Sequence, residues 1–147
     1  MPSKSLGFTL LELMVVLVIV ALATAGVSLA MRDSDATRIE REGLRLSALL
    51  ESARAQSRTS GLPVVWRSLP QGFEFIGLPT QGGLKGARPW LNQDTQAQVI
   101  QPPGAQSLVL GPEPLIPAQR VVLAQGTRRI TLGTDGLSPF AVLGSAP

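Results

Sequence analysis

The pattern of hydrophobic and polar positions differs between parts of the chain, and a long apolar segment lies near the N-terminus. Residues 13–31 are nineteen consecutive uncharged and mostly apolar positions. As a helix this run would measure about 28 Å, close to the ~30 Å hydrocarbon core of a bilayer. A lone strand in lipid would leave its backbone polar groups without partners, so the run predicts a membrane-spanning helix.

Residues 32–60 mix charged residues with an apolar stripe. The positions of the stripe, spaced by four, three, four, three and four residues, are Ile39, Gly43, Leu46, Leu50, Ala53 and Ser57. This spacing predicts one face of a helix, which we expect to pack on the protein's own globular domain. The same face also suits a neighbouring helix in an assembly. Beside it, Glu42 with Arg45 and Glu51 with Arg54 are expected to form weak surface pairs.

Glycine and proline separate these helical segments from the rest of the chain. From Phe8 to Ser60 there are two glycines and no proline, whereas Gly61–Pro147 holds twelve glycines and eleven prolines. The helix is therefore predicted to end near Gly61-Leu62-Pro63. Short apolar runs follow, bounded by turn residues, at 64–66, 73–76, 98–100, 108–110, 121–124, 130–132 and 140–143.

These runs favour antiparallel sheets over alternating strands and helices. The expected fold class is α+β. A long N-terminal helix, with a transmembrane half and an amphipathic half, would pack on a C-terminal antiparallel β-sheet or β-sandwich head.

Composition argues against an enzyme. The chain has no cysteine and no histidine, and only Lys4 and Lys85 are lysines among its thirteen cationic residues. Disulfides, Cys/His metal sites and histidine-based triads are excluded, and no metal or cofactor is expected. The head's acidic residues are scattered at Glu74, Asp94, Glu113 and Asp135. Asp135-Gly136 is interpreted as a turn pair, and Trp66 and Trp90 as core and turn packing.

The N-terminal segment Gly7-Phe8-Thr9-Leu10-Leu11-Glu12 follows a short leader that contains Lys4. A secretory signal peptide would have a cleavage site such as Ala21-Leu22-Ala23, but the apolar run continues past it to Met31. A plain signal anchor would explain the length of the run. It would leave unexplained why a carboxylate, Glu12, lies at the edge of the hydrocarbon.

The segment resembles the type IV prepilin signature. That resemblance implies that a prepilin peptidase and N-methyltransferase cuts between Gly7 and Phe8 and methylates the new amine of Phe8. It also implies that Glu12 neutralises the terminal amine of an adjacent subunit, and in a helix Phe8 and Glu12 share a face one turn apart. The resulting divisions are a leader (1–7), a transmembrane helix half (8–31), an amphipathic periplasmic helix half (32–60) and a β-rich periplasmic head (61–147).

The rest of the chain resembles the GspH/FimT class of minor pseudopilins in its helix at Leu46–Ser57, its strand at Val64-Val65-Trp66 and its hairpin at Arg129–Pro139. Residues 77–118 carry no matching motif. The resemblance implies a subunit of the type II secretion pseudopilus, which assembles with other pseudopilins to help export folded proteins across the outer membrane. It would cross the bacterial inner membrane once, with the head in the periplasm. Lys4 on the cytoplasmic side agrees with the positive-inside tendency.

A FimT-like minor pilin of a type IV pilus or DNA-uptake machine is the alternative. Arg120, Arg128 and Arg129 are the candidates for phosphate contacts. In a strand, however, Arg128 and Arg129 point to opposite faces, so the doublet does not form one patch. The head carries six basic and four acidic residues. Nucleic acid is therefore not the expected partner.

Overall fold

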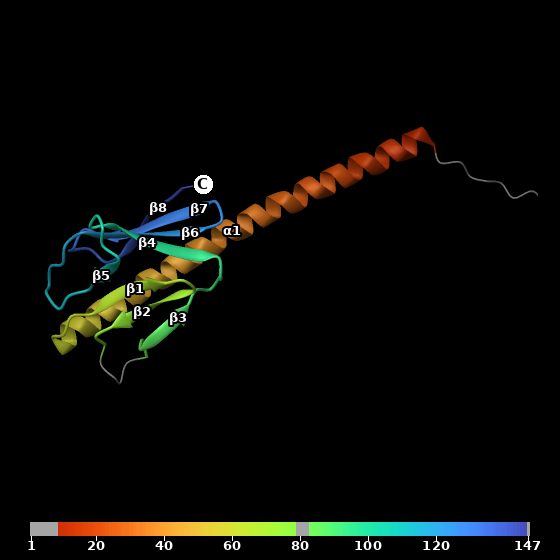
Figure 1. The fold of residues 1–147 in the computed structure, drawn as a ribbon. Coiled ribbons are helices and arrows are strands. Elements are labelled where there is room, and N and C mark those ends of the chain that lie inside the picture. The colour runs from red at the N-terminus through yellow and green to blue at the C-terminus, as the bar shows by residue number, and fades with distance from the viewer. Residues whose placement is uncertain (1–8, 79–82, 147) are drawn as a thin grey trace, which may run out of the picture. The chain divides into compact units, whose positions relative to one another are not determined.

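The computed structural model describes residues 9–78 and 83–146, with side chains placed for 9–26, 36–78 and 83–144. The described residues form one helix and eight strands (Figure 1). The elements are α1 (Leu10–Ser60), β1 (Val65–Leu69), β2 (Gly72–Ile76), β3 (Gly86–Pro89), β4 (Thr95–Gln101), β5 (Ser107–Val109), β6 (Gln119–Gln125), β7 (Arg128–Thr134) and β8 (Ala141–Ala146). The chain divides into two compact units, Met1–Asp35 and Ala36–Pro147. The fold is α+β, as the sequence predicts.

The strands form two four-stranded antiparallel sheets. Their orders are β3-β2-β1-β5 in the first sheet and β4-β6-β7-β8 in the second. Each of the seven runs expected to be extended contributes to a strand. The sequence pattern did not indicate β3, whose residues Gly-Ala-Arg-Pro show no apolar alternation. Two-residue turns close the β1–β2 and β6–β7 hairpins and fix their registers.

Glycine ends α1 where the sequence places the boundary. The helix stops at Ser60, and Gly61 has a φ of 69°, a left-handed value that glycine adopts without steric cost. The Gly61 N–H donates to the carbonyl oxygen of Ser57, 2.9 Å away. A backbone acceptor that the last turn leaves free is thereby satisfied.

The apolar stripe of α1 forms part of the core of the head, which confirms the interpretation that it packs on its own domain. All six stripe positions are buried. At Gly43 the helix comes so close to the second sheet that an added Cβ would collide with Ile130. On the side of the first sheet, the guanidinium of Arg45 lies 5.7 Å from the centre of the Phe73 ring.

Aromatic side chains fill the core at the first sheet. Trp66, Phe73 and Trp90 are all buried, and the Phe73 ring centre lies 6.2 Å from that of Trp66 and 4.7 Å from that of Trp90. Both tryptophans therefore serve in packing, as expected. Aromatic pairs at such separations stabilise a core beyond their buried area alone.

The expectation of surface ion pairs on α1 is wrong in one respect. Arg45 lies 3.0 Å from Glu42, and Arg54 lies 3.8 Å from Glu51, so both pairs form. In each pair, however, one side chain is buried: only 2% of Glu42 and 3% of Arg54 is exposed. Helical spacing indicates that such residues meet, but it does not indicate that a head covers them.

Candidate functional site

The first turn of α1 is built by Thr9 and Glu12. The Glu12 N–H donates to the Thr9 side-chain oxygen at 3.3 Å, and the Leu13 N–H donates to the Thr9 carbonyl oxygen at 3.2 Å. Thr9 is therefore the N-cap of the helix, and Glu12 occupies the third helical position. Sequence reasoning missed this role of Thr9, although Thr-x-x-Glu is a known signature of a helix start.

Glu12 has an exposed position in this turn. A carboxylate in the first turn interacts favourably with the positive end of the helix dipole, typically by about 0.3–1 kcal/mol. Glu12 therefore already helps to start its own helix, apart from any role between subunits. Lys4, Gly7 and Phe8 lie outside the described residues, so the expected pairing of Phe8 with Glu12 stays a prediction.

The following turns of α1 present apolar side chains on every side. Leu10, Leu11 and Leu22 expose 78%, 74% and 69% of their surface, and all side chains described between Leu10 and Gly26 are exposed. A helix that is apolar all round is normally covered by protein or lipid. No described segment of helix is long and apolar enough to be identified as a membrane span.

The three arginines proposed for phosphate contacts lie on the second sheet, but they do not form one group. The buried Ile130 and Leu132 are on the inner face of β7, and Arg128, two residues before Ile130, is on the same face. Arg129 is on the opposite, outer face. The expected separation of Arg128 from Arg129 is thus confirmed.

Arg120 and Arg129 do share the outer face of the second sheet. Both are exposed, and each has the outward parity of its strand. Arg129 lies opposite Ala124 of β6, four residues from Arg120. The two backbone positions are therefore about 13 Å apart along the strand. Two cations at this distance do not form a compact basic patch.

The buried Arg54 is a polar anchor that the sequence analysis did not identify. Its Nη2 donates to the carbonyl oxygens of Gly136, at 2.7 Å, and Pro114, at 3.3 Å. Its Nη1 reaches the carbonyl oxygen of Ser138 at 3.4 Å. One side chain of α1 thus holds the β5–β6 connection and the β7–β8 turn together. The feature of the sequence that could have indicated this role is the position of Arg54 directly after Ala53 of the apolar stripe.

Other polar side chains of α1 serve the head in the same way. The Leu91 N–H donates to Glu42 at 2.6 Å, and the Phe140 N–H donates to Glu51 at 2.9 Å. The Ser47 hydroxyl donates to the carbonyl oxygen of Phe140. These bonds satisfy backbone groups that precede or follow strands, where no sheet partner is available.

The acidic residues of the head do not gather into a site. Within the residues that the structure describes, no group of three or more aspartate, glutamate, cysteine or histidine side chains could hold a metal ion. Asp135 accepts hydrogen bonds from the N–H groups of Ser138, at 2.7 Å, and Leu137, at 2.9 Å. These bonds, that of Ser138 above all, lower the pKa of Asp135 below its usual value. Asp135-Gly136 is therefore a turn pair, as expected.

Comparison with known proteins gives one result, and it concerns the N-terminal segment. Residues 2–28 match the family described as the prokaryotic N-terminal methylation motif. No curated protein and no solved structure matches the chain. The matched residues include most of the expected leader, together with Thr9, Glu12 and the first turns of α1. The chain therefore carries the N-terminal processing signal of a type IV pilin-like protein.

Proposed function

We propose that this protein is a minor pseudopilin of a type II secretion system. It assembles through its N-terminal helix into the pseudopilus and helps to export folded proteins across the outer membrane. The observation that carries the proposal is the match of residues 2–28 to the N-terminal methylation motif. This motif implies processing by prepilin peptidase and assembly with other pilin-like subunits. In the proposed processing, the peptidase cuts between Gly7 and Phe8, and the new amine of Phe8 is methylated.

The exposed apolar surface of α1 supports an assembly role. In the unassembled subunit we place this part of the helix in the inner membrane, with the head in the periplasm. In the fibre, neighbouring helices would cover the same side chains. Glu12, exposed in the first turn, would then pair with the methylated amine of Phe8 from an adjacent subunit. A charge pair at low dielectric favours the assembled state, since either partner alone would be costly.

The amphipathic segment Leu46–Ser57 supports the assignment to the GspH/FimT class. It packs on the head through the buried Leu46, Leu50 and Arg54. A FimT-like minor pilin in DNA uptake is the second candidate. The observation in its favour is that Arg120 and Arg129 share one exposed face.

The decisive experiment uses Glu12→Ala, with Glu40→Ala as the matched control because Glu40 is also an exposed acidic residue of α1. In both variants we expect mass spectrometry to find a methylated Phe8 as the first residue. Only Glu12→Ala should lose association with the other pseudopilins and the secretion of folded periplasmic enzymes. DNA uptake should stay normal.

Two other outcomes have clear meanings. If the Glu12→Ala variant secretes normally but loses transformation, the protein is instead a minor pilin of a DNA-uptake machine. A mature N-terminus at Thr24 would show that signal peptidase had acted and would overturn the pilin-like interpretation of the leader.

A further inference from the structure

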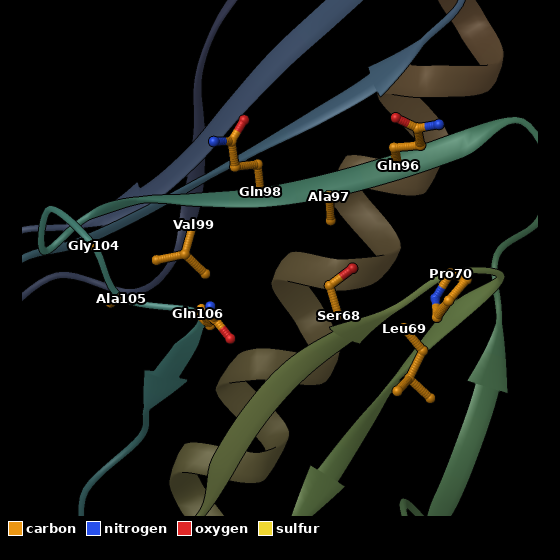
Figure 2. A pocket seen from close by; sticks show the side chains of 10 residues that line it. All are labelled: Ser68, Leu69, Pro70, Gln96, Ala97, Gln98, Val99, Gly104, Ala105 and Gln106. Atoms are coloured by element: carbon orange, nitrogen blue, oxygen red, sulfur yellow. The ribbon is translucent and has the colours of Figure 1, made fainter.

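A cleft of about 680 Å³ lies in the head between β1 and β4 (Figure 2). One wall is Gln96–Val99 of β4, the other is Ser68–Pro70 at the end of β1, and Gly104–Gln106 complete the lining. In Figure 2 the side chains of Ser68 and Ala97 face each other across the gap. Every residue that lines the cleft is uncharged.

The backbone of β4 has a free edge along this cleft. β4 is the end strand of its sheet, and among the described residues its only strand neighbour is β6. Gln125 and Arg128 flank a two-residue turn, so they exchange hydrogen bonds with each other. The N–H and C=O of the preceding residue, Ala124, must then point to β4, where Ala124 lies opposite Gln96.

Alternation along β4 identifies the groups on its free edge. Because Gln96 is turned to β6, the N–H and C=O groups of Ala97 and Val99 point away from β6. The position of Thr95 agrees with this pattern, since its N–H donates to the carbonyl oxygen of Asn92 at 3.1 Å and not to β6. Ala97 and Val99 thus offer two donors and two acceptors on the side of the cleft.

The opposite wall of the cleft, at the end of β1, also has backbone groups without a strand partner, but over a shorter stretch. Leu69 and Gly72 flank the two-residue turn of the first hairpin, so the backbone groups of Ser68 point away from β2. β5 pairs with that edge of β1, but the pairing ends at Arg67 opposite Ser107. Ser68 is the next position beyond this end, and it lines the cleft.

The two edges of the first sheet are protected, in contrast to β4. β3 has Arg88 and Pro89 at its end, which are residues typical of a blocked edge. On β5, the Val109 N–H donates to the side-chain oxygen of Gln119, and the Gln119 amide donates back to the Val109 carbonyl oxygen, at 2.8 and 2.7 Å. Thr95–Val99 contains neither charge nor proline, and the irregularity of β4 begins only after Val99.

We propose that this cleft binds an extended, uncharged peptide segment of another protein, which adds to the free edge of β4 as a further strand. Main-chain hydrogen bonds to Ala97 and Val99 would supply the affinity. Small apolar side chains of the segment would face Val99 and Ala97, and polar ones would lie beside Gln96 and Gln98. A charged segment would be disfavoured, because no lining residue could pair with its charge. This inference requires only the folded head and does not depend on the proposed secretion role.

The test measures amide hydrogen exchange of the full-length protein in detergent. The probe is a synthetic five-residue peptide of alternating valine and glutamine with blocked ends. We expect exchange at the Ala97 and Val99 amides to slow about tenfold when the peptide is at ten times its dissociation constant. The amide of Leu123 in the central strand β6 serves as the internal reference and should not change.

Two controls separate strand addition from loose contact. A peptide methylated on its alternate backbone nitrogens should give no protection, because it cannot donate to the edge. Ala97→Pro removes one edge donor without breaking the ladder to β6, and should weaken binding at least tenfold. Val122→Lys, on the outer face opposite Gln98, should bind like the parent. If Ala97→Pro does not fold, the methylated peptide tests the same bond from the ligand side.

Three results would overturn the proposal. The first is unchanged exchange at Ala97 and Val99 up to the solubility limit of the peptide. The second is equal protection by the methylated peptide. The third is protection that rises with protein concentration alone, which would make the occupant a second copy of this chain.

Discussion

The Arg54 guanidinium donates a hydrogen bond to the carbonyl oxygen of Gly136, with 2.7 Å between Nη2 and O, although the two residues are 82 positions apart in the chain. Gly136 has a φ of 100°, and a Cβ there would collide with the carbonyl oxygen of Ile116. The turn at Gly136 is thus fixed by its own conformation, by the neighbouring connection and by a buried charge from the helix.

The first prediction concerns the removal of the Arg54 charge. Arg54→Ala would leave three carbonyl oxygens without their donor, so we expect a loss of about 3–5 kcal/mol in the free energy of unfolding. Urea unfolding followed by the fluorescence of the buried Trp66 and Trp90 measures it. Arg58→Ala, one turn later and exposed, is the control and should change stability by less than about 0.5 kcal/mol. Equal effects of the two substitutions would refute the anchoring role.

Glu42 gives a second, independent prediction. It is buried and accepts hydrogen bonds from Arg45 and from the N–H of Leu91. Glu42→Ala should cost about 2–4 kcal/mol, since the Leu91 N–H loses its acceptor and Arg45 loses its ion-pair partner. Glu40→Ala removes an exposed carboxylate from the same turn and should be nearly neutral. The same urea titration compares them, and a stable Glu42→Ala protein would count against this contact.

Gly43 and Ile130 form a pair whose effects should not add. Alanine is favoured over glycine within a helix by about 1 kcal/mol, yet a Cβ at Gly43 would overlap Cδ1 of Ile130. We expect Gly43→Ala to destabilise the head by about 1–2 kcal/mol through overpacking. Ile130→Val removes the overlapping atom and should rescue most of that loss in the double variant. Strictly additive effects in the double-mutant cycle would mean that the two sites do not touch.

The fourth prediction concerns how the stability of the head changes with pH through Asp135 in the β7–β8 turn. Hydrogen bonds from Ser138 and Leu137 hold the pKa of Asp135 below the usual 3.8. A carboxyl group whose pKa is lower in the folded state stabilises that state at neutral pH, and this contribution is lost as the pH falls below about 4. Asp135→Asn should therefore reduce stability at pH 7 and leave it little changed near pH 2. A carboxyl-detected NMR titration gives the pKa, and an ordinary value would contradict stabilisation of the carboxylate by these two backbone donors.

The apolar pattern predicted the helical part of the fold and the face on which it packs. The spacing from Ile39 to Ser57 fixes that face because helical geometry is local, and Gly61 ends the helix for an equally local reason. Strand positions followed from short apolar runs. β3 was missed because its residues Gly86–Pro89 have no alternating apolar side, and it is held by its pairing with β2.

What the sequence did not predict depends on contacts between distant residues. Arg54 and Glu42 looked like surface residues because nothing near them in the chain indicates the loops that cover them. The free edge of β4 likewise follows from the strand order, which places β6 on one side of it and the cleft on the other. The role of Thr9 as the N-cap of α1 did not depend on distant contacts, since the Thr-x-x-Glu pattern of Thr9 and Glu12 indicates it within four residues.

The bonds from Ser47 and Glu51 to Phe140 also have a consequence for the time course of folding. They join residues 93 and 89 positions apart, so the helix meets this partner late in translation. At about 5–20 residues per second the delay is about 5–20 s. During this interval the second sheet lacks its last strand, β8, so the core that includes Leu46 and Leu50 is incomplete. The nascent chain therefore has to pass through a stage in which the apolar face of its amphipathic helix is partly open to chaperones, proteases and other unfinished chains.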